Sequence, residues 1–344
     1  MRYPHYLKEK NTIGFVSPSF SCAIEPYFSA FKNAQTKFIE KGYNIYLGYN
    51  CYVNKGIGIC NTPQECAREL QEMYESDKND ILISCGGGEL MCEILPYIDF
   101  EKLKKSSPKW FMGYSDNTNF TFLSATILDT AAIYGPCAAT FGMNPWHKSL
   151  EDCMNLLSGK TKKIQGYDGW ELESLKTPEN PLEPYNITEK ENYVYYPATL
   201  KEEGVTIKGR LLGGCMDCLS MLAGTRFDKV KEFKEKYKED GIIWFLEACD
   251  LNVMSIRRVL WQLRENGWFE NTKGFLIGRP MHFNEPDFGI DQYQAVTDVL
   301  KEFNVPIIMD LDIGHLSPMV PLICGGNAIV SAQNNTFSVE YLYN

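Results

Sequence analysis

Short apolar runs alternate with amphipathic stretches along the first half of the chain, and this alternation constrains the fold more than any other feature. Thr12–Ser17 and Asp80–Ser84 are apolar runs that end in Ser-Pro and Gly-Gly-Gly, which is typical of buried strands. Glu25–Lys41 has apolar residues at helical spacing and is followed by Gly42, while Thr62–Ser76 opens with a Thr-Pro pair that suits a helix N-terminus. Strands that alternate with helices of this length predict βαβ units and a mostly parallel sheet.

One irregular segment interrupts this alternation. The segment 166–191 contains three prolines, several acidic residues and little periodicity, which indicates a linker or a long surface loop. A length of 344 residues suits two domains, so we expect an N-terminal domain at 1–165, an inter-domain loop at 166–191 and a C-terminal domain at 192–344. The predicted fold class is α/β, with a mostly parallel, Rossmann-like (flavodoxin-like) sheet in the first domain and a mixed sheet in the second. The other predicted strands are 43–47, 110–113, 193–197, 205–212, 242–246, 275–277 and 306–309; the other predicted helices are 117–128, 216–222, 253–266 and 291–302; and an antiparallel hairpin is expected at 328–332 and 336–341.

Charge and hydropathy exclude several classes of partner. The formal net charge is -10 and no Lys/Arg-rich block is present to neutralise phosphates, so we expect no nucleic-acid partner. No run of about 18 apolar residues is present, so we expect no membrane span. The N-terminal residues lack an apolar core before a cleavage site, so we expect no secretory signal and predict a cytoplasmic location.

The twelve cysteines do not suggest a disulfide framework, which is typical of short secreted chains. Most of them lie inside apolar runs, so we expect reduced and mostly buried thiols. Cys215 and Cys218 form the one C-x-x-C pair, and no second pair or His pair stands at ligand spacing. We therefore expect no metal site.

The sharpest local motif is Gly113-Tyr114-Ser115-Asp116-Asn117, between a predicted strand and a predicted helix. A serine on such a turn projects its hydroxyl beyond the sheet, and the N–H of the next residue points to an oxygen bound there. The motif differs from the G-x-S-x-G elbow because asparagine replaces the last glycine. The alternative is that Ser-Asp simply caps the following helix.

A nucleophilic serine needs a base and a carboxylate that orients it. Of the four histidines, His5 lies in the N-terminal tail, His147 in a polar turn and His282 beyond a strand end. His315 follows Asp-Ile-Gly just beyond the predicted strand 306–309, where α/β sheets place ligands. The acid candidate is Glu247, at the end of an apolar strand, with Asp250 as its local competitor.

The glycine run Gly86-Gly87-Gly88 directly follows the strand Asp80–Ser84. It lacks the Lys-Ser/Thr of a P-loop and the full G-x-G-x-x-G spacing, so we expect no nucleotide cofactor. Glycines here can let backbone N–H groups approach an oxyanion, and the alternative is a tight strand-to-helix turn.

These motifs together resemble the LD-carboxypeptidase family (serine peptidase family S66), which includes muropeptide LD-carboxypeptidases and microcin C7 self-immunity peptidases. The resemblance covers nearly the whole chain. It starts at LKEKNTIGFVSPS and runs through SCGGGELMCEILPYIDF, KWFMGYSDNTNF, YGPCAATFG, GRLLGGCMDCLSMLAGT, WFLEACD and GFLIGRP to DIGHLSPMVPLICGG. The joint occurrence of these motifs in order makes the match specific.

The resemblance implies a serine carboxypeptidase that needs no cofactor. Ser115 matches the family nucleophile, Glu247 its acid and His315 its base, and the backbone N–H groups of Gly87 and Asp116 match its oxyanion hole. Family members carry the serine on an N-terminal parallel-sheet domain and the acid and base on a C-terminal domain, with the active site at the domain junction. They often dimerise, so we expect a homodimer.

The resemblance also implies a small peptide or muropeptide substrate. The first prediction is a murein tetrapeptide, whose terminal D-Ala is released by cleavage of the L,D-amide. The alternative is a peptidyl- or aminoacyl-nucleotide amide, as in the microcin C7 immunity branch.

Two departures from the family bear on the substrate. Cys215 stands where many members have asparagine, and the glycine loop reads CGGGE where muropeptide enzymes tend to have an aromatic residue. The FLEACD and GGC forms look closer to the microcin-immunity branch, which stacks a nucleotide-like group on an aromatic residue of the inter-domain loop. Trp170 is the candidate for that stacking, or else a packing anchor. Arg210, Arg257 and Arg279 are candidates to bind a terminal carboxylate, or else surface salt-bridge partners.

Two other classes of function compete with the peptidase. A non-catalytic ligand-binding protein on the same fold would bind without turnover, and the presence of Ser115, Glu247 and His315 speaks against it. A nicotinamide-dependent oxidoreductase would need a phosphate-binding glycine loop, which this sequence lacks.

Overall fold

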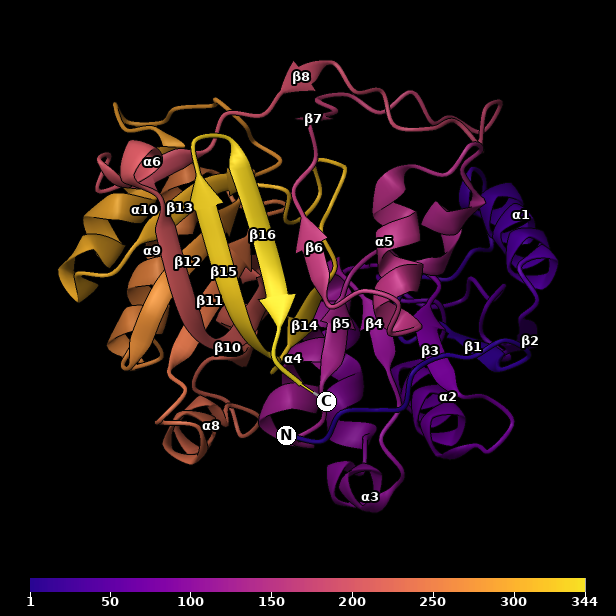
Figure 1. The fold of residues 1–344 in the computed structure, drawn as a ribbon. Helices are drawn as coiled ribbons and strands as arrows, with labels where there is room; N and C mark the ends of the chain where they lie inside the picture. Colours follow the sequence, from indigo (N-terminus) through magenta and orange to yellow (C-terminus); the bar gives the residue numbers. More distant parts are fainter. Residues whose placement is uncertain (344) are drawn as a thin grey trace. The chain divides into compact units, whose positions relative to one another are not determined.

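The computed structural model describes residues 1–343 of the chain and contains two compact units. Unit 1 consists of Met1–Thr161, Glu173–Asn186 and Pro321–Ile323, and unit 2 consists of Lys162–Leu172, Ile187–Val320 and Cys324–Asn344. Each unit is built around one main sheet (Figure 1). The segment that interrupts the sequence pattern contributes residues to both units.

The sheet of unit 1 has the strand order β14-β5-β4-β3-β1-β2. All pairings from β2 to β5 are parallel, which confirms the predicted parallel sheet. The order 2-1-3-4-5 is that of flavodoxin-like doubly wound folds, in which ligands bind beyond the carboxyl ends of the strands, at the switch point between β1 and β3. The strands are β1 (Thr12–Val16), β2 (Asn44–Leu47), β3 (Ile81–Ser84), β4 (Phe111–Gly113), β5 (Ala132–Tyr134) and β14 (Leu322–Cys324).

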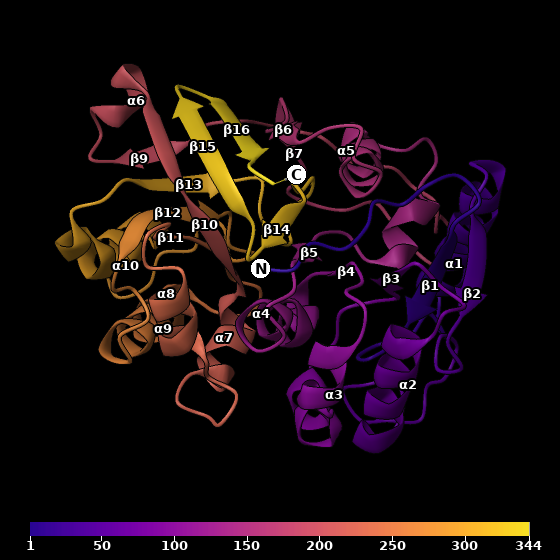
Figure 2. The ribbon, with the colours of Figure 1, turned by 60° about the horizontal axis from the view of Figure 1, so that its bottom comes forward.

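Helices cover both faces of this sheet, with α2, α3 and α4 on one side and α1 and α5 on the other (Figure 2). The N-terminus of α2 forms as its sequence predicts, because the Thr62 side chain accepts a hydrogen bond from the Glu65 N–H at 3.3 Å. The α-helices are α1 (Tyr27–Glu40), α2 (Pro63–Glu75), α3 (Phe100–Lys105), α4 (Thr118–Thr126) and α5 (Lys148–Leu157), and the 3-10 helices are η1 (Met91–Tyr97), η2 (Ser115–Asn117) and η3 (Ala138–Gly142).

The sheet of unit 2 has the order β6-β16-β15-β10-β11-β12-β13-β9. Its four central strands, β10 to β13, are parallel, and the outer pairings are antiparallel, so the predicted mixed sheet is confirmed. All six residues of β11 are buried, so this strand lies within the core. The strands are β6 (Lys163–Gln165), β9 (Val194–Tyr196), β10 (Val205–Cys215), β11 (Ile242–Glu247), β12 (Thr272–Gly278), β13 (Ile307–Leu311), β15 (Asn327–Gln333) and β16 (Thr336–Tyr341).

Two short strands lie inside the segment that the sequence predicts to be a loop. β7 (Gly169–Trp170) and β8 (Glu189–Lys190) pair antiparallel and form a separate two-stranded sheet. The predicted helix 216–222 is found with the same bounds. The helices of unit 2 are α6 (Leu200–Glu203), α7 (Met216–Leu222), α8 (Val230–Lys236), α9 (Val253–Glu265), α10 (Gln292–Leu300) and the 3-10 helix η4 (Lys301–Phe303).

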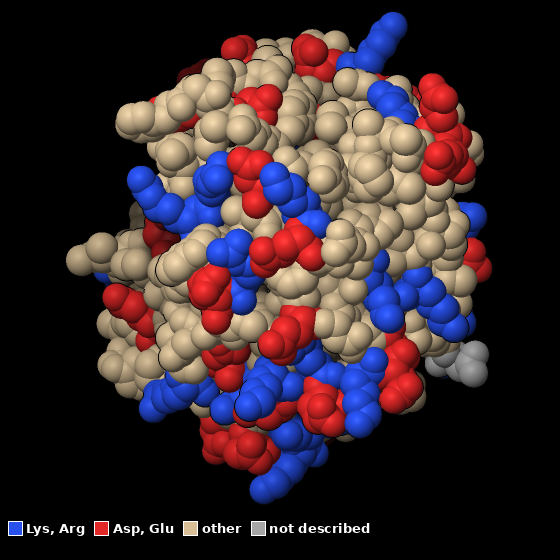
Figure 3. All heavy atoms as spheres, turned by 90° about the vertical axis from the view of Figure 1, so that its left-hand side faces the viewer, with Lys and Arg blue, Asp and Glu red and all other residues tan. Residues whose placement is uncertain are grey.

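The surface carries mixed charge on the face drawn in Figure 3, where Lys and Arg side chains are interspersed with Asp and Glu. All twelve cysteines are unbridged, and all are buried except Cys92 and Cys249, which are half-buried. The expectation of mostly buried thiols is therefore confirmed. Within residues 1–343, no helix combines the length and the apolar character that crossing a membrane requires.

Candidate active site

Ser115 occupies a sharp turn between β4 and α4 of unit 1. Its φ is 62°, in the left-handed region, which costs a non-glycine residue about 1–3 kcal/mol. Its backbone N–H donates to the hydroxyl of Tyr134 at 3.2 Å. A serine in a strained turn at the carboxyl end of a parallel strand has the backbone of a nucleophile elbow.

Asp116 is buried, and its side chain links the serine turn to the loop at Ser19, to the start of η1 and to α4. Its Oδ2 accepts from Ser19 Oγ at 2.5 Å and from the Met91 N–H at 2.8 Å, and its Oδ1 accepts from Asn119 Nδ2 at 3.0 Å. Burial raises the pKa of Asp116, although these hydrogen bonds offset part of the shift. The carboxylate therefore serves as an anchor, and the backbone N–H is the part of Asp116 that could take part in catalysis.

Asn117 explains why the turn lacks the last glycine of the G-x-S-x-G pattern. Its Nδ2 donates to the carbonyl oxygens of Gly86 at 2.8 Å and Tyr114 at 3.1 Å. The side chain thus links the serine turn to the glycine loop that follows β3, which a glycine could not do.

Gly87 lies directly against Ser115. A Cβ on Gly87 would be 3.1 Å from both Cβ and Oγ of Ser115. The Gly86 carbonyl also accepts from Ser84 Oγ at 3.0 Å, and the Gly87 carbonyl accepts from the Phe20 N–H at 2.6 Å. Because a trans peptide points its N–H opposite to its C=O, the bonds to the Gly86 carbonyl also fix the direction of the Gly87 N–H. Hydrogen bonds thus hold the glycine loop where it contacts the serine.

The sequence-predicted acid and base contact each other within unit 2. Glu247 ends β11 and is fully buried, and its Oε2 lies 2.9 Å from Nδ1 of His315, in the loop after β13. The competing acid Asp250 is exposed, and its N–H donates to Asp217 Oδ1 at 2.9 Å. With Nδ1 on the carboxylate, Nε2 is the ring nitrogen that can act as a base.

Two glycines make room for Glu247. A Cβ on Gly314, whose φ is 108°, would lie 2.6 Å from Glu247 Oε2, and a Cβ on Gly278 would lie 3.0 Å from Glu247 Cβ. The Asp-Ile-Gly-His motif therefore needs its glycine both for the backbone turn and for the close approach of the carboxylate.

Opposing effects act on the pKa of His315. Burial lowers it, but the Glu247 carboxylate and the hydrogen bond with Cys249 raise it by more, so that the pKa lies well above 6.5. The imidazolium form is thus stabilised, as a base that collects a proton during catalysis requires.

The other three histidines lie elsewhere. His5 is exposed, and His147 accepts from the Ser149 N–H at 3.1 Å as the N-cap of α5. His282 is exposed and lies 2.8 Å from Glu285. His315 is the sequence-predicted candidate that the structure places on a buried carboxylate.

The sequence-predicted substrate-binding residues are largely engaged within unit 2. Cys215 is buried opposite Glu247 in the β10–β11 register, with Sγ 3.3 Å from Asp217 Oδ2. Trp170 is buried against Phe283, with ring centroids 4.9 Å apart. Arg279 is buried between Glu191 and Asp312, while Arg210 pairs with Asp240 and Arg257 with Asp298.

Several site residues were not found from the sequence. Ser19 and Tyr134 support the serine turn, and no local pattern pointed to either of them. Cys249 contacts the imidazole of His315. The backbone N–H of Cys249 donates to Asp217 Oδ2 at 3.1 Å. For Asp217 a signal existed, because it lies in the first turn of a helix just beyond the end of a parallel strand, where α/β sheets place their sites.

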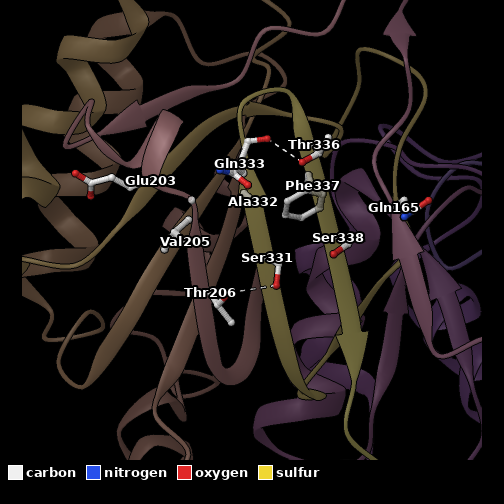
Figure 4. Close-up of a pocket in the computed structure, with 11 residues that line it drawn as sticks. Gln165, Glu203, Val205, Thr206, Ser331, Ala332, Gln333, Thr336, Phe337 and Ser338 are labelled. Atoms are coloured by element: carbon white, nitrogen blue, oxygen red, sulfur yellow. Dashed lines mark hydrogen bonds between the residues drawn. The ribbon is translucent and has the colours of Figure 1, made fainter.

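A hollow of about 410 Å³ is lined by residues at one end of β10, β15 and β16 of the unit 2 sheet (Figure 4). Hydroxyl and amide side chains line it, including Thr206 and Ser331, whose oxygens are 3.4 Å apart. None of the sequence-predicted site residues lines this hollow.

Comparisons with known proteins agree on one family. The family model described as LD-carboxypeptidase N-terminal domain matches residues 13–135, and the one described as LD-carboxypeptidase C-terminal domain matches residues 208–330. The microcin C7 self-immunity protein MccF of Escherichia coli is 24% identical over 97% of this chain and 94% of its own length. A Bacillus subtilis protein named "Probable murein peptide carboxypeptidase" is 24% identical over 98% of this chain and 94% of its own length.

Solved structures share the fold. An MccF-like protein from Bacillus anthracis has a TM-score of 0.82 at 22% identity and covers 99% of this chain and 100% of its own. MccF in complex with glutamyl sulfamoyl guanosine has a TM-score of 0.81 at 21% identity and covers 99% of this chain and 98% of its own.

Proposed function

The chain belongs to the LD-carboxypeptidase family and is a serine peptidase-like hydrolase, and on this premise we propose that Ser115, Glu247 and His315 form its catalytic triad. The observation that carries the proposal is the 2.9 Å contact between His315 Nδ1 and the fully buried Glu247. The left-handed turn at Ser115 and the close approach of Gly87 to its hydroxyl support the same assignment.

In the proposed mechanism, His315 Nε2 takes the proton of Ser115 Oγ while that oxygen attacks the amide carbonyl. The N–H groups of Gly87 and Asp116 donate to the oxyanion that forms, and each such donor is worth about 3–4 kcal/mol in the barrier. His315 then gives its proton to the leaving amine, and water hydrolyses the acyl-enzyme by the same route. Throughout, Glu247 orients the imidazole and stabilises its charged form. This proposal requires Ser115 of unit 1 and His315 of unit 2 to meet when substrate binds.

As substrate we propose a murein tetrapeptide, from which cleavage of the L,D-amide releases the terminal D-Ala. The similarity to the Bacillus subtilis protein named as a murein peptide carboxypeptidase supports this choice. A peptidyl- or aminoacyl-nucleotide amide is the second candidate. It is favoured by the similarity to MccF, which has been solved with aspartyl sulfamoyl adenosine and with glutamyl sulfamoyl guanosine.

The test is release of D-alanine from an L,D-tetrapeptide, compared between the wild type and Ser115→Ala. We expect release by the wild type and a loss of at least about 10⁴-fold in kcat for the variant, because the nucleophile is gone. If the folded wild type releases nothing, the murein substrate is wrong, and the same pair is assayed on aminoacyl-nucleotide amides. If neither substrate is cleaved but both are bound, the protein is a ligand-binding protein on this fold.

Three further expectations remain predictions. They are a homodimeric assembly, a cytoplasmic location, and a division in which the domain at 1–165 carries the nucleophile and the domain at 192–344 carries the acid and base. Light scattering of the purified chain tests the first.

A further inference from the structure

The loop that carries His315 is held on both sides of the histidine by the stretch around β7. The N–H of Tyr167 donates to Asp312 Oδ2 at 2.9 Å, and the N–H of Glu171 donates to the Ser317 carbonyl at 2.8 Å. Tyr167 and Glu171 are the first and last residues of what we call the β7 segment. Since Asp312 precedes His315 by three residues and Ser317 follows it by two, the β7 segment fixes the loop at both ends.

Of the two residues that the β7 segment contacts, Asp312 and Ser317, Asp312 is held more strongly. It is fully buried, forms an ion pair with Arg279 and accepts from the Tyr193 hydroxyl at 3.3 Å. Its own carbonyl accepts from the Val320 N–H at 2.8 Å, which closes the loop. A Cβ on Gly166 would lie 3.2 Å from Asp312 Oδ2, so the backbone just before Tyr167 packs against the same carboxylate oxygen.

Arg279 connects Asp312 to the rest of unit 2. Its side chain is 1% exposed, and its Nη1 donates to Glu191 Oε2 at 3.0 Å and to the Asp310 carbonyl at 2.7 Å. The guanidinium also lies over the ring of Trp170, 5.0 Å from its centroid. One planar group thus joins the ends of β12 and β13 to the strands β7 and β8, a task that suits the rigid fork of arginine.

We propose that Arg279 and Asp312, together with the backbone of the β7 segment, are positioning groups that keep His315 on Glu247. The inference rests on the proposed function in one respect, the role of His315 as the base. The physical link is short, because Gly314, the residue before His315, packs directly against the Glu247 carboxylate. A shift of about 1 Å in such a group can cost about 10²-fold in rate.

Asp312→Asn tests the proposal, because it keeps an acceptor for the Tyr167 N–H and removes the charge that pairs with Arg279. We expect kcat to fall roughly 10- to 100-fold with KM within about twofold, since the loop does not have to touch substrate to act. The matched control is Asp240→Asn, which breaks the 2.5 Å ion pair with Arg210 in the same unit and should leave kcat within about twofold.

A second readout does not depend on turnover. In the wild type, the proton on His315 Nδ1 should give a downfield NMR signal because it is hydrogen-bonded to a carboxylate. Asp312→Asn should shift or broaden this signal, and Asp240→Asn should not. A folded Asp312→Asn protein with wild-type kcat and an unchanged signal would overturn the proposal. If this variant does not fold, Arg279→Lys takes its place with the same expected outcomes, because lysine keeps the charge but cannot bridge three partners.

A fluorophosphonate probe separates failure of this inference from failure of the proposed function. If the probe labels the wild type but not Ser115→Ala, the serine mechanism holds and kcat is a valid readout. If it labels neither protein and no substrate is cleaved, the proposed function fails, and the imidazole signal alone decides whether Arg279 and Asp312 position the histidine.

Discussion

Glu247 and His315 set the proton chemistry of this chain at the scale of single residues. The carboxylate is fully buried, and the imidazole that contacts it is 13% exposed, so solvent screens their interaction only weakly. Burial lowers the pKa of His315, while Glu247 and then Cys249 raise it by more. The histidine therefore keeps its proton to a higher pH than an ordinary imidazole does.

The pH dependence of catalysis follows from this shift. His315 must be unprotonated to accept the proton of Ser115, so kcat/KM should rise with pH, and the midpoint of its acid limb should lie above 6.5. Glu247→Gln should move this limb to lower pH and reduce kcat by about 10³–10⁴-fold, because the imidazole loses both its orientation and its partner charge. Cys249→Ala is the matched comparison and should move the limb less. A wild-type limb below 6.5 would contradict the assignment.

At the scale of elements, two neighbouring glycines of the loop after β3 have different structural roles. Gly87 lies outside the left-handed region, and a Cβ there would meet Ser115 Cβ and Oγ at 3.1 Å. Gly88 has a φ of 149°, and a Cβ there would lie 1.9 Å from Ser19 Oγ. Gly87 leaves space for the reacting hydroxyl, whereas the backbone conformation at position 88 requires a glycine.

Alanine at these two positions should therefore give opposite phenotypes. Gly87→Ala should lower kcat roughly 10- to 100-fold with a small change in Tm, because the backbone tolerates alanine while the methyl group crowds Ser115. Gly88→Ala should destabilise the protein by about 1–3 kcal/mol, through backbone strain and overpacking. Thermal melts and steady-state kinetics of both variants are the measurements. The interpretation fails if Gly87→Ala keeps kcat within twofold.

Sequence patterns predicted most of the long elements, with α5 as an exception, and several short strands such as β4 and β9. Other short strands were missed for a physical reason. The helix α9 and the hairpin β15–β16 show clear periods, and they fold within a residue or two of the predicted bounds. The strands β5 and β14 have three residues each, too few to show a period. The strands β7 and β8 pair across an excursion of the chain through 173–186, and a local pattern cannot report such a partner.

The candidate site, like the fold, could be predicted from the sequence only in part. Ser115, Glu247 and His315 could be ranked from the sequence because each lies at or just beyond the end of a predicted strand. The contacts that hold them could not, because Ser19 reaches Asp116 across 97 positions of sequence. The structure places Arg279 between carboxylates of its own chain, and composition gave no sign of these partners.

At the scale of the whole molecule, buried acids in both units predict a protein that is more stable in mild acid than at alkaline pH. Burial raises the pKa of Glu69 in unit 1 to about 7, although the N–H groups of Ser17 and Asn50 offset part of the shift. In unit 2, burial and then the neighbouring Asp312 raise the pKa of Glu191 to about 8, against the lowering effect of Arg279.

The sign of the pH effect follows from these two groups. Each binds a proton more tightly in the folded chain than in the unfolded chain, where the pKa is near 4.5. Their contribution is therefore fully present below about pH 4.5 and is lost as the pH rises through 7 and 8. The pKa of His315 is raised as well, and this shift acts in the same direction. Burial lowers the pKa of Lys109 to about 8, and this shift opposes the trend only above that pH.

We therefore expect Tm to fall by at least about 5 °C between pH 5 and pH 8, measured by calorimetry at constant ionic strength. Glu69→Gln and Glu191→Gln should each flatten this slope whatever they do to Tm at pH 5, because an amide cannot release the proton that the folded state retains. Glu235→Gln, at a glutamate that is 76% exposed, should leave the slope unchanged. Because the two acids belong to different units, the double variant should flatten the slope by the sum of the single effects. A Tm that rises from pH 5 to pH 8 in the wild type, with a slope that neither single variant changes, would contradict this account. The burial of these two carboxyl groups would then be balanced by charge rather than by protonation.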